Sequence, residues 1–152
     1  MKVIVAGAGA FGTKHLDGIA RIKGVEVAAL VGRRLEPTQE VASKYGIEVA
    51  TTSLDEALSV DGVEAAILCT PTQMHAAQAI QCMKAGKHVQ VEIPLADSLA
   101  DAQAVAAVQQ STGLVCMVGH TRRFNPSHQW VHKRIAAGQF NIQQMDVQPY
   151  FF

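Results

Sequence analysis

The feature that most constrains the fold of this chain is a glycine-rich hexapeptide that directly follows its first apolar run. Residues 2–6 predict a strand and residues 11–22 a helix, and Gly7-Ala8-Gly9-Ala10-Phe11-Gly12 at their junction fits the pattern G-x-G-x-x-G. The first glycine allows a tight turn, the second lets the backbone approach a pyrophosphate, and the third lets helix and strand pack closely. Free N–H groups at the helix start would face the phosphates. We therefore expect a dinucleotide to bind at Gly7, Gly9, Ala10, Phe11 and Gly12. The alternative is a turn that is glycine-rich for structural reasons alone.

Short β-branched runs and helical stretches alternate along the rest of the chain. Further strands are predicted at residues 25–31, 48–51, 63–68, 88–91 and 114–118, and further helices at residues 36–45, 54–58, 72–84, 98–110 and 126–137. Apolar strands separated by helices are typical of a parallel sheet that is covered on both faces. The sequence therefore predicts an α/β fold, the doubly wound parallel sheet of a Rossmann domain.

The composition narrows the classes of partner. Thirteen Lys and Arg residues balance thirteen Asp and Glu residues, so there is no basic surplus of the kind that nucleic acids or anionic membranes attract. No apolar run approaches the roughly 18 residues of a membrane span. Three cysteines lie far apart in apolar stretches, which favours core residues in a reducing compartment over a disulfide framework or metal ligands. We expect a cytoplasmic protein with no nucleic-acid or membrane partner.

The pattern changes near residue 140, where the last predicted helix has ended. Residues 142–152 look extended and finish in the apolar run Pro149-Tyr150-Phe151-Phe152. We expect residues 1–139 to form the nucleotide-binding domain and residues 140–152 to form the first strand of a second α/β domain, most of which would follow this chain.

The end of the second predicted strand bears on the choice of cofactor. NAD-binding domains usually have Asp or Glu about 20 residues after the glycine loop, where the carboxylate binds the ribose hydroxyls. This chain has Val31-Gly32-Arg33-Arg34 there instead. Two guanidinium groups can pair with a 2′-phosphate, and no carboxylate repels it. Arg33 and Arg34 therefore favour NADP over NAD, with a solvated basic turn as the alternative.

Polar segments follow several of the predicted strands. Thr70, Pro71 and Thr72 come after the fourth strand, and we expect Thr72 to cap the next helix. These three residues fall at the carboxyl edge of the sheet, where ligands bind in this fold, so we expect them to contact the cofactor. The segment from Thr70 reads T-P-x-x-x-H and ends at His75; G-K-H-V, Glu92-Ile93-Pro94 and R-R-F-N-P occur farther along. Together with the glycine loop, these motifs resemble the GFO/IDH/MocA oxidoreductase family over essentially the whole chain.

The resemblance implies several features of function. Family members pair a Rossmann half with an α/β half whose open sheet covers the nicotinamide, and they commonly form homo-oligomers. By resemblance, His75 and Glu92 lie on the cofactor side, with a helix-surface position as the alternative for His75. Three segments (69–75, 90–98 and 116–128) are most similar to a subgroup of semialdehyde dehydrogenases. These enzymes oxidise the CH–OH group of a carboxylated cyclic hemiacetal with NADP, during the degradation of aromatic compounds.

One position departs from the family pattern. The usual E-K-P motif carries a lysine that is implicated in catalysis, and this sequence has Ile93 there, as the semialdehyde dehydrogenases do. The catalytic residues therefore stay unassigned, and we expect them in the part of the protein beyond this chain. A sugar or inositol dehydrogenase and a regulatory module that binds NADP without turnover remain the alternatives.

The remaining candidates are cationic or histidine residues. We expect Arg122 and Arg123 at the start of the last helix, and we expect Arg122 to contact the cofactor or a substrate carboxylate; ion pairs with neighbouring acids are the alternative. His120 is a candidate substrate contact. We expect His15 to pack or cap within the first helix rather than act in catalysis. His128 and His132 lie one helical turn apart but lack a third ligand, so we expect no metal site.

Overall fold

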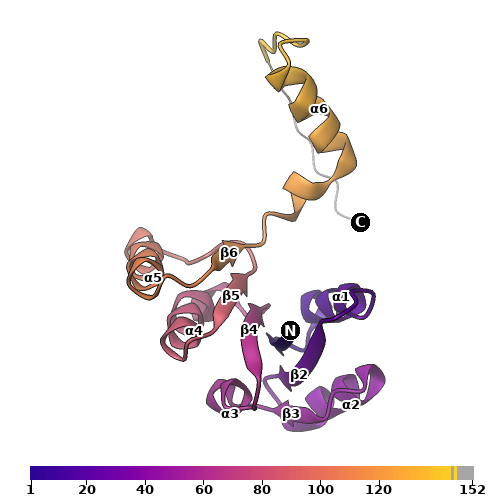
Figure 1. Ribbon diagram of the computed structural model, residues 1–152, viewed down its shortest axis with the longest axis vertical. Coiled ribbons are helices and arrows are strands. Elements are labelled where there is room, and N and C mark those ends of the chain that lie inside the picture. The colour runs from indigo at the N-terminus through magenta and orange to yellow at the C-terminus, as the bar shows by residue number, and fades with distance from the viewer. Residues whose placement is uncertain (145, 147–152) are drawn as a thin grey trace. The chain divides into compact units, whose positions relative to one another are not determined.

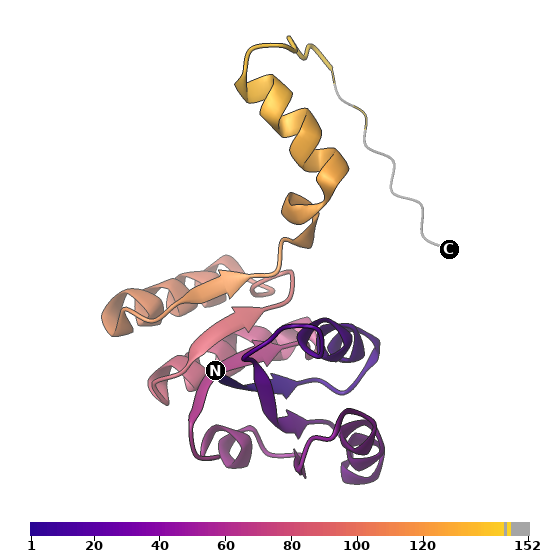
Figure 2. The same ribbon diagram turned by 45° about the vertical axis from the view of Figure 1, so that its right-hand side comes forward.

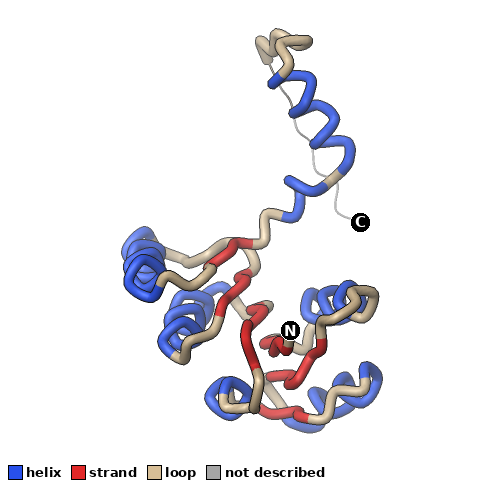
Figure 3. Tube along the Cα trace, viewed as in Figure 1, coloured by secondary structure: helices blue, strands red, loops and turns tan. Residues whose placement is uncertain are grey.

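The structure is a computed structural model that describes residues 1–144 and 146. Within that part of the chain, six strands form one parallel sheet in the order β3-β2-β1-β4-β5-β6 (Figures 1 and 3). This is the strand order of a Rossmann domain, so the predicted fold class is confirmed. The strands are β1 (Lys2–Ala6), β2 (Glu26–Val31), β3 (Val49–Thr51), β4 (Val63–Leu68), β5 (His88–Val91) and β6 (Cys116–Val118).

Helices connect the strands and cover both faces of the sheet (Figure 2). Alternate residues of β1 show how the two cores arise, since Val3 and Val5 pack into one core while Ile4 and Ala6 pack into the other. Leu16 of α1 belongs to the first core, and Met83 of α4 belongs to the second. The helices are α1 (Ala10–Ile19), α2 (Leu35–Tyr45), α3 (Leu54–Leu58), α4 (Thr72–Lys84), α5 (Leu99–Thr112), the 3₁₀ helix η1 (Thr121–Phe124) and α6 (Pro126–Ala136).

Most of the predicted elements agree with the structure to within two residues, and two regions differ. The first helix ends at Ile19 instead of Ile22, because the chain tightens into 3₁₀-type turns in which the amide of Ile22 donates to the carbonyl of Ile19. Gly24, with φ of +81°, then reverses the chain into β2. The 3₁₀ helix η1 was not predicted. It separates β6 from α6, which Asn125 caps by accepting a hydrogen bond from the Ser127 amide.

Contacts divide the chain into two compact units, Met1–Gly119 and His120–Phe152. The first unit holds the whole sheet, and the second holds η1 and α6, where Trp130 packs on Phe140. The break comes earlier than the division after residue 139 that the sequence suggests, because η1 and α6 pack with each other; the division into domains stays a prediction. Residues 140–144 are not in a strand, and the rest of the expected strand lies outside the described residues, residue 146 apart. Among the described helices, none is long and apolar enough to cross a membrane.

Candidate cofactor site

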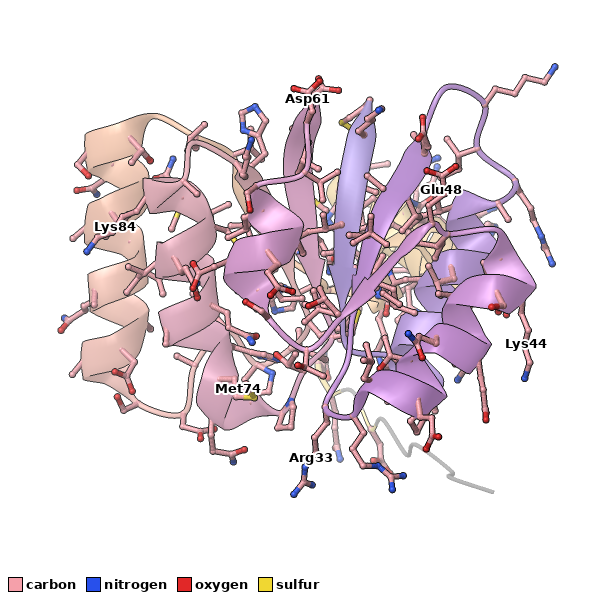
Figure 4. All side chains as sticks on the ribbon, turned by 90° about the horizontal axis from the view of Figure 1, so that it is seen from below. Arg33, Lys44, Glu48, Asp61, Met74 and Lys84 are labelled. Atoms are coloured by element: carbon pink, nitrogen blue, oxygen red, sulfur yellow. The ribbon has the colours of Figure 1, made fainter. Side chains whose placement is uncertain are left out.

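The carboxyl ends of the parallel strands bring the predicted site segments of the first unit to one edge of the sheet. Figure 4 shows Arg33, which follows β2, and Met74, in the first turn of α4, at this edge. Asp61 and Glu48, which precede β4 and β3, lie at the opposite edge. In sheets of this kind, ligands bind beyond the carboxyl ends of the strands, where the strand order reverses. Here that point lies between β1 and β4.

Two glycines of the loop after β1 are required by the protein's own packing. Gly7 has φ of +113°, and a Cβ atom there would overlap the carbonyl oxygen of Cys69. A Cβ atom on Gly12 would overlap the carbonyl oxygen of Gly7. The amide of Gly7 also donates to the carbonyl of Val31, 2.8 Å away, which joins the loop to the end of β2. The tight turn and the close helix packing are therefore explained without a ligand.

The middle glycine has no such internal reason. Gly9 adopts φ of −85°, which any residue can adopt, and a Cβ atom there would meet nothing within 4 Å. Gly9 is the N-cap of α1, and no side chain caps the helix or places an acidic group in its first turn. The N–H groups of the first turn, which includes exposed Ala10 and Phe11, therefore receive no hydrogen bond from a capping side chain. We call Gly9 and the first turn of α1 the cradle. A pyrophosphate fits it, because glycine leaves open the space through which a phosphate can reach the backbone N–H groups.

The turn after β2 presents two cations. A Cβ atom on Gly32 would overlap the hydroxyl of Thr38, which is buried in α2 and donates to the carbonyl of Arg34, 2.6 Å away. The backbone of the turn is thus fixed, while the side chains of Arg33 and Arg34 are exposed. Neither forms an ion pair within the described residues. Both guanidinium groups are available to an anion at this end of the site.

His75 joins two loops at the other end of the site. It is buried, and its ring nitrogens Nδ1 and Nε2 each lie 2.7 Å from a backbone carbonyl oxygen, of Pro94 and of Thr70 respectively. The helix-surface alternative for this residue is therefore wrong. Both nitrogens are occupied by protein atoms, so the geometry makes His75 a support for the loops, and direct contact with a cofactor stays a prediction.

The start of α4 differs from the prediction in one detail. Pro71 is the N-cap and Thr72 is the first helical residue, without a side-chain cap bond. The hydroxyl of Thr70 instead donates to Oε1 of Gln78, 2.6 Å away, and this bond ties the loop to the next turn of α4. Thr72 was expected to cap the helix, and that expectation is wrong because the proline already ends the extended segment.

A pair of side chains that the sequence did not bring together faces this edge. Nε2 of His15 lies 2.8 Å from Oε1 of Glu92, joining α1 to the loop after β5. His15 was expected to pack or cap within its helix, so the partner was missed. One signal was available: His15 follows Gly12 by three residues, and residues at that spacing share a helix face.

The second unit places the remaining candidates as follows. Arg122 and Arg123 lie in η1 and do not open α6, so that expectation is wrong. His120 is the N-cap of η1. Within this unit, a cavity of about 620 Å³ is lined by Arg122, Arg123, His128, Gln129, His132 and Lys133. Its ionisable lining groups are all basic, which suits an anion.

The cysteines show no sign of reactivity. All three are free thiols, and burial raises the pKa of Cys82 to about 12. Burial and the nearby Glu92 carboxylate raise the pKa of Cys69 to about 12, and burial also raises the pKa of the Cys116 thiol. Among the described residues, no group of three or more His, Cys, Asp or Glu side chains could hold a metal ion.

The fold and this edge define a dinucleotide-binding Rossmann domain. The family model described as "Oxidoreductase family, NAD-binding Rossmann fold" (GFO_IDH_MocA) matches residues 1–120, and the model "Bacterial oxidoreductases, C-terminal" matches residues 126–152. The chain therefore belongs to the GFO/IDH/MocA oxidoreductase family, which confirms the resemblance found from the motifs.

Individual relatives agree with this assignment. The chain is 66% identical over all of its 152 residues to 4-carboxy-2-hydroxymuconate-6-semialdehyde dehydrogenase of Sphingobium sp. SYK-6, and covers 48% of that protein. It is 31% identical over 140 residues (91% of the chain) to scyllo-inositol 2-dehydrogenase (NAD(+)) of Bacillus subtilis, covering 41% of it. A solved 3-ketoreductase from Actinomadura kijaniata, in complex with TDP-benzene and NADP, superposes with a TM-score of 0.83 at 26% identity, over 91% of this chain and 44% of that one. The chain spans about half the length of the curated relatives it matches.

Proposed function

We propose that this chain is the cofactor-binding part of an NADP-dependent dehydrogenase that acts on a CH–OH group. The proposed reaction is oxidation of the cyclic hemiacetal of 4-carboxy-2-hydroxymuconate-6-semialdehyde to 2-pyrone-4,6-dicarboxylate. The observation that carries the cofactor part is Gly9, a glycine that neither its backbone angles nor its neighbours require. The observation that supports the substrate is 66% identity over the whole chain to a dehydrogenase of that name.

The chain's own residues would hold the cofactor along the edge of the sheet. The N–H groups at the start of α1 would bind the pyrophosphate, and Arg33 and Arg34 would bind the 2′-phosphate of the adenosine half. The loops after β4 and β5, with Thr70, His75 and Glu92, would then face the nicotinamide half. When bound, NADP accepts a hydride from the CH–OH carbon. Ile93 offers no proton-accepting atom, so the hydroxyl proton must leave to another group.

A substrate with several carboxylates suits the second unit. Residues 120–152 contain four Lys and Arg residues and a single acidic residue, Asp146. The cavity lined by Arg122, Arg123 and Lys133 gathers three of these four cations. Guanidinium groups bind carboxylates through paired hydrogen bonds, which supports a carboxylated substrate over a neutral sugar or inositol.

A matched pair of glycine variants tests the cofactor site. Gly9→Ala adds a methyl group in the open cradle, and Gly18→Ala adds one in open space within the same helix. We expect Gly9→Ala to weaken NADPH binding at least 100-fold and to lower the free energy of unfolding by no more than about 1 kcal/mol, because alanine is a poorer N-cap than glycine. Gly18→Ala should bind NADPH as the wild type does and gain about 0.5–1 kcal/mol of stability from its helix propensity. Fluorescence titration and urea unfolding measure the two quantities.

Equal NADPH affinity in both variants would contradict the proposed site. It would show that a methyl group at Gly9 does not interfere with NADPH, so NADPH would not bind against the backbone there. The reaction itself is tested with the full-length protein, by following NADPH formation at 340 nm with the hemiacetal as substrate. Tight NADPH binding without turnover would instead support a regulatory module. Turnover of inositol alone would support the inositol-type alternative that the Bacillus relative represents.

We further propose that the protein is cytoplasmic and that the full-length protein forms a homo-oligomer. Its partner would be a small carboxylated substrate, and it would bind neither nucleic acid nor membrane. The three free thiols and the balanced charge of the chain support the location and the absence of a polyanionic partner. The family assignment supports the oligomer. Size-exclusion chromatography of the full-length protein with light scattering measures it directly.

A further inference from the structure

The contact between His15 and Glu92 is short and largely shielded from solvent. Nε2 of His15 lies 2.8 Å from Oε1 of Glu92, and the two side chains keep only 24% and 13% of their exposure. By comparison, the ion pair between the N-terminus and Glu64 is 3.7 Å long, and both of its side chains are at least half exposed. A short, mostly desolvated contact fixes side chains far better than an exposed one.

The pair spans the place where the strand order reverses. His15 belongs to α1, which follows β1, and Glu92 follows β5. Between these strands lies β4, whose carboxyl end leads into Cys69 and Thr70. The contact therefore links the helix that starts at the glycine loop to the far side of the ligand-binding crevice.

The backbone of Glu92 is anchored, and its side chain lies close to Gly119. Its amide donates to the carbonyl of Leu68, 2.9 Å away. Gly119 leaves room for it, since a Cβ atom there would lie 3.0 Å from Oε1 of Glu92 and 2.8 Å from Nε2 of Gln90. Oε1 of Gln90 is buried and has no hydrogen-bond partner in the described part of the chain, so this region still has an acceptor to satisfy.

We propose that His15 is a positioning residue that fixes the Glu92 carboxylate for the nicotinamide half of the dinucleotide. His15 holds Oε1, and Oε2 is left to accept a hydrogen bond from a ribose hydroxyl. The assignment to this half follows from direction: Arg33 and Arg34 stand at the end of β2 on one side of the glycine loop, and Glu92 stands beyond β4 on the other. The inference rests on the proposed function, because it takes the dinucleotide to bind across the loop.

The role of His15 is preorganisation. Without an imidazole at Oε1, the carboxylate can rotate or take up water, and binding must then order it again. Ligands that reach Glu92 should therefore lose affinity when His15 is removed, whereas ligands that extend only to the glycine loop should bind as before. A merely structural role would weaken both kinds of ligand together, which makes the two roles separable by experiment.

The test uses the full chain with two probes, NADPH and 2′,5′-ADP, which has the adenosine end alone. Calorimetric titration gives the affinity of each for the wild type, His15→Ala and His15→Gln. We expect His15→Ala to weaken NADPH about 10-fold, or about 1.4 kcal/mol, with 2′,5′-ADP affinity unchanged. His15→Gln keeps an N–H donor for Oε1 and should restore NADPH affinity to within about 3-fold of the wild type.

Asp17→Asn is the matched control on the same helix, because Asp17 accepts from the Tyr45 hydroxyl and does not touch Glu92. It should leave both affinities unchanged. Equal weakening of both probes by His15→Ala, or unchanged NADPH affinity, would overturn the positioning role while NADPH binding by the wild type upholds the proposed function. A wild-type chain that binds neither NADPH nor 2′,5′-ADP overturns the proposed cofactor site and this inference together.

Discussion

The two ends of the candidate cofactor site are built in opposite ways. At the end of β2, Arg33 and Arg34 are exposed, and within the described residues neither forms an ion pair. At the ends of β4 and β5, His75 is buried between two carbonyl oxygens, and His15 is paired with Glu92. The arginine end has charged side chains available to a ligand. At the histidine end, the side chains are already in contact with other groups of the protein.

This difference separates specificity from stability. Exposed side chains without partners can change with little effect on folding, since surface substitutions usually alter stability by less than about 0.5 kcal/mol. Substitution of a buried hydrogen-bonded side chain lowers stability more, because its hydrogen-bond partner is then left unsatisfied. The arginine end can therefore set the choice of cofactor, while the histidine end holds the loops that any dinucleotide would meet.

The largest effect is expected at the loop that both ends share. A Cβ atom at Gly12 would overlap the Gly7 carbonyl, and backbone cannot give way cheaply. Gly12→Ala should lower the free energy of unfolding by about 3 kcal/mol or more and abolish cofactor binding. Urea unfolding followed by circular dichroism measures the change. A stability within 1 kcal/mol of the wild type would show that α1 can shift away from β1.

The second effect tests the histidine end. His75→Leu removes both ring nitrogens of a buried side chain and leaves the carbonyls of Thr70 and Pro94 without the nitrogens that lie 2.7 Å from them. We expect a loss of about 2–4 kcal/mol in the free energy of unfolding. His132→Leu, at an exposed position, is the control and should change it by less than about 0.5 kcal/mol. Similar free energies of unfolding for the two variants would contradict the view that the histidine end stabilises the fold.

A third effect concerns pH, and it comes from Cys69 in the loop after β4 and from Cys82 in the core part of α4. The pKa values of Cys69 and Cys82 are raised to about 12, so the folded chain keeps thiol protons that the unfolded chain loses above pH 9. The unfolded state then binds fewer protons, and the free energy of unfolding should fall as the pH rises from about 9 toward 12. Substituting both cysteines by alanine should flatten this part of the curve. An unchanged slope would contradict the assigned burial of the thiols.

Thiol labelling gives an independent reading of the same shifts. At pH 8 both groups should resist a disulfide reagent in the folded chain, because the thiolate is the reactive form. All three cysteines should react in urea. Rapid labelling of Cys69 without denaturant would show that the loop after β4 is open.

Much of this arrangement could be predicted from the sequence, and the reason is local. The glycine pattern, the apolar strands and the arginines after β2 each depend on a few neighbouring residues, so their element and edge follow from order along the chain. The pairing of His15 with Glu92 joins residues 77 positions apart, and the burial of His75 depends on the loop at Pro94. Such contacts depend on how loops close over the sheet, which periodicity does not specify.

The second unit shows the same limit. The helix from Pro126 was predicted, whereas η1 was missed because a four-residue 3₁₀ turn has no apolar period to detect. Arg122 and Arg123 were consequently placed in the wrong element. The basic surplus of residues 120–152 can be counted from the sequence, but only the structure shows that Arg122, Arg123 and Lys133 line one cavity.

The most direct test of the account is the ratio of NADPH to NADH affinity in the wild type and in Arg33→Ala/Arg34→Ala. The account predicts that the wild type prefers NADPH by at least 10-fold, and that the double variant loses this preference with its NADH affinity and unfolding free energy unchanged. Arg33→Lys/Arg34→Lys should keep part of the preference, since lysine retains the charge and loses the paired geometry. Equal affinity for NADPH and NADH in the wild type would contradict the assignment of this end of the site to the 2′-phosphate.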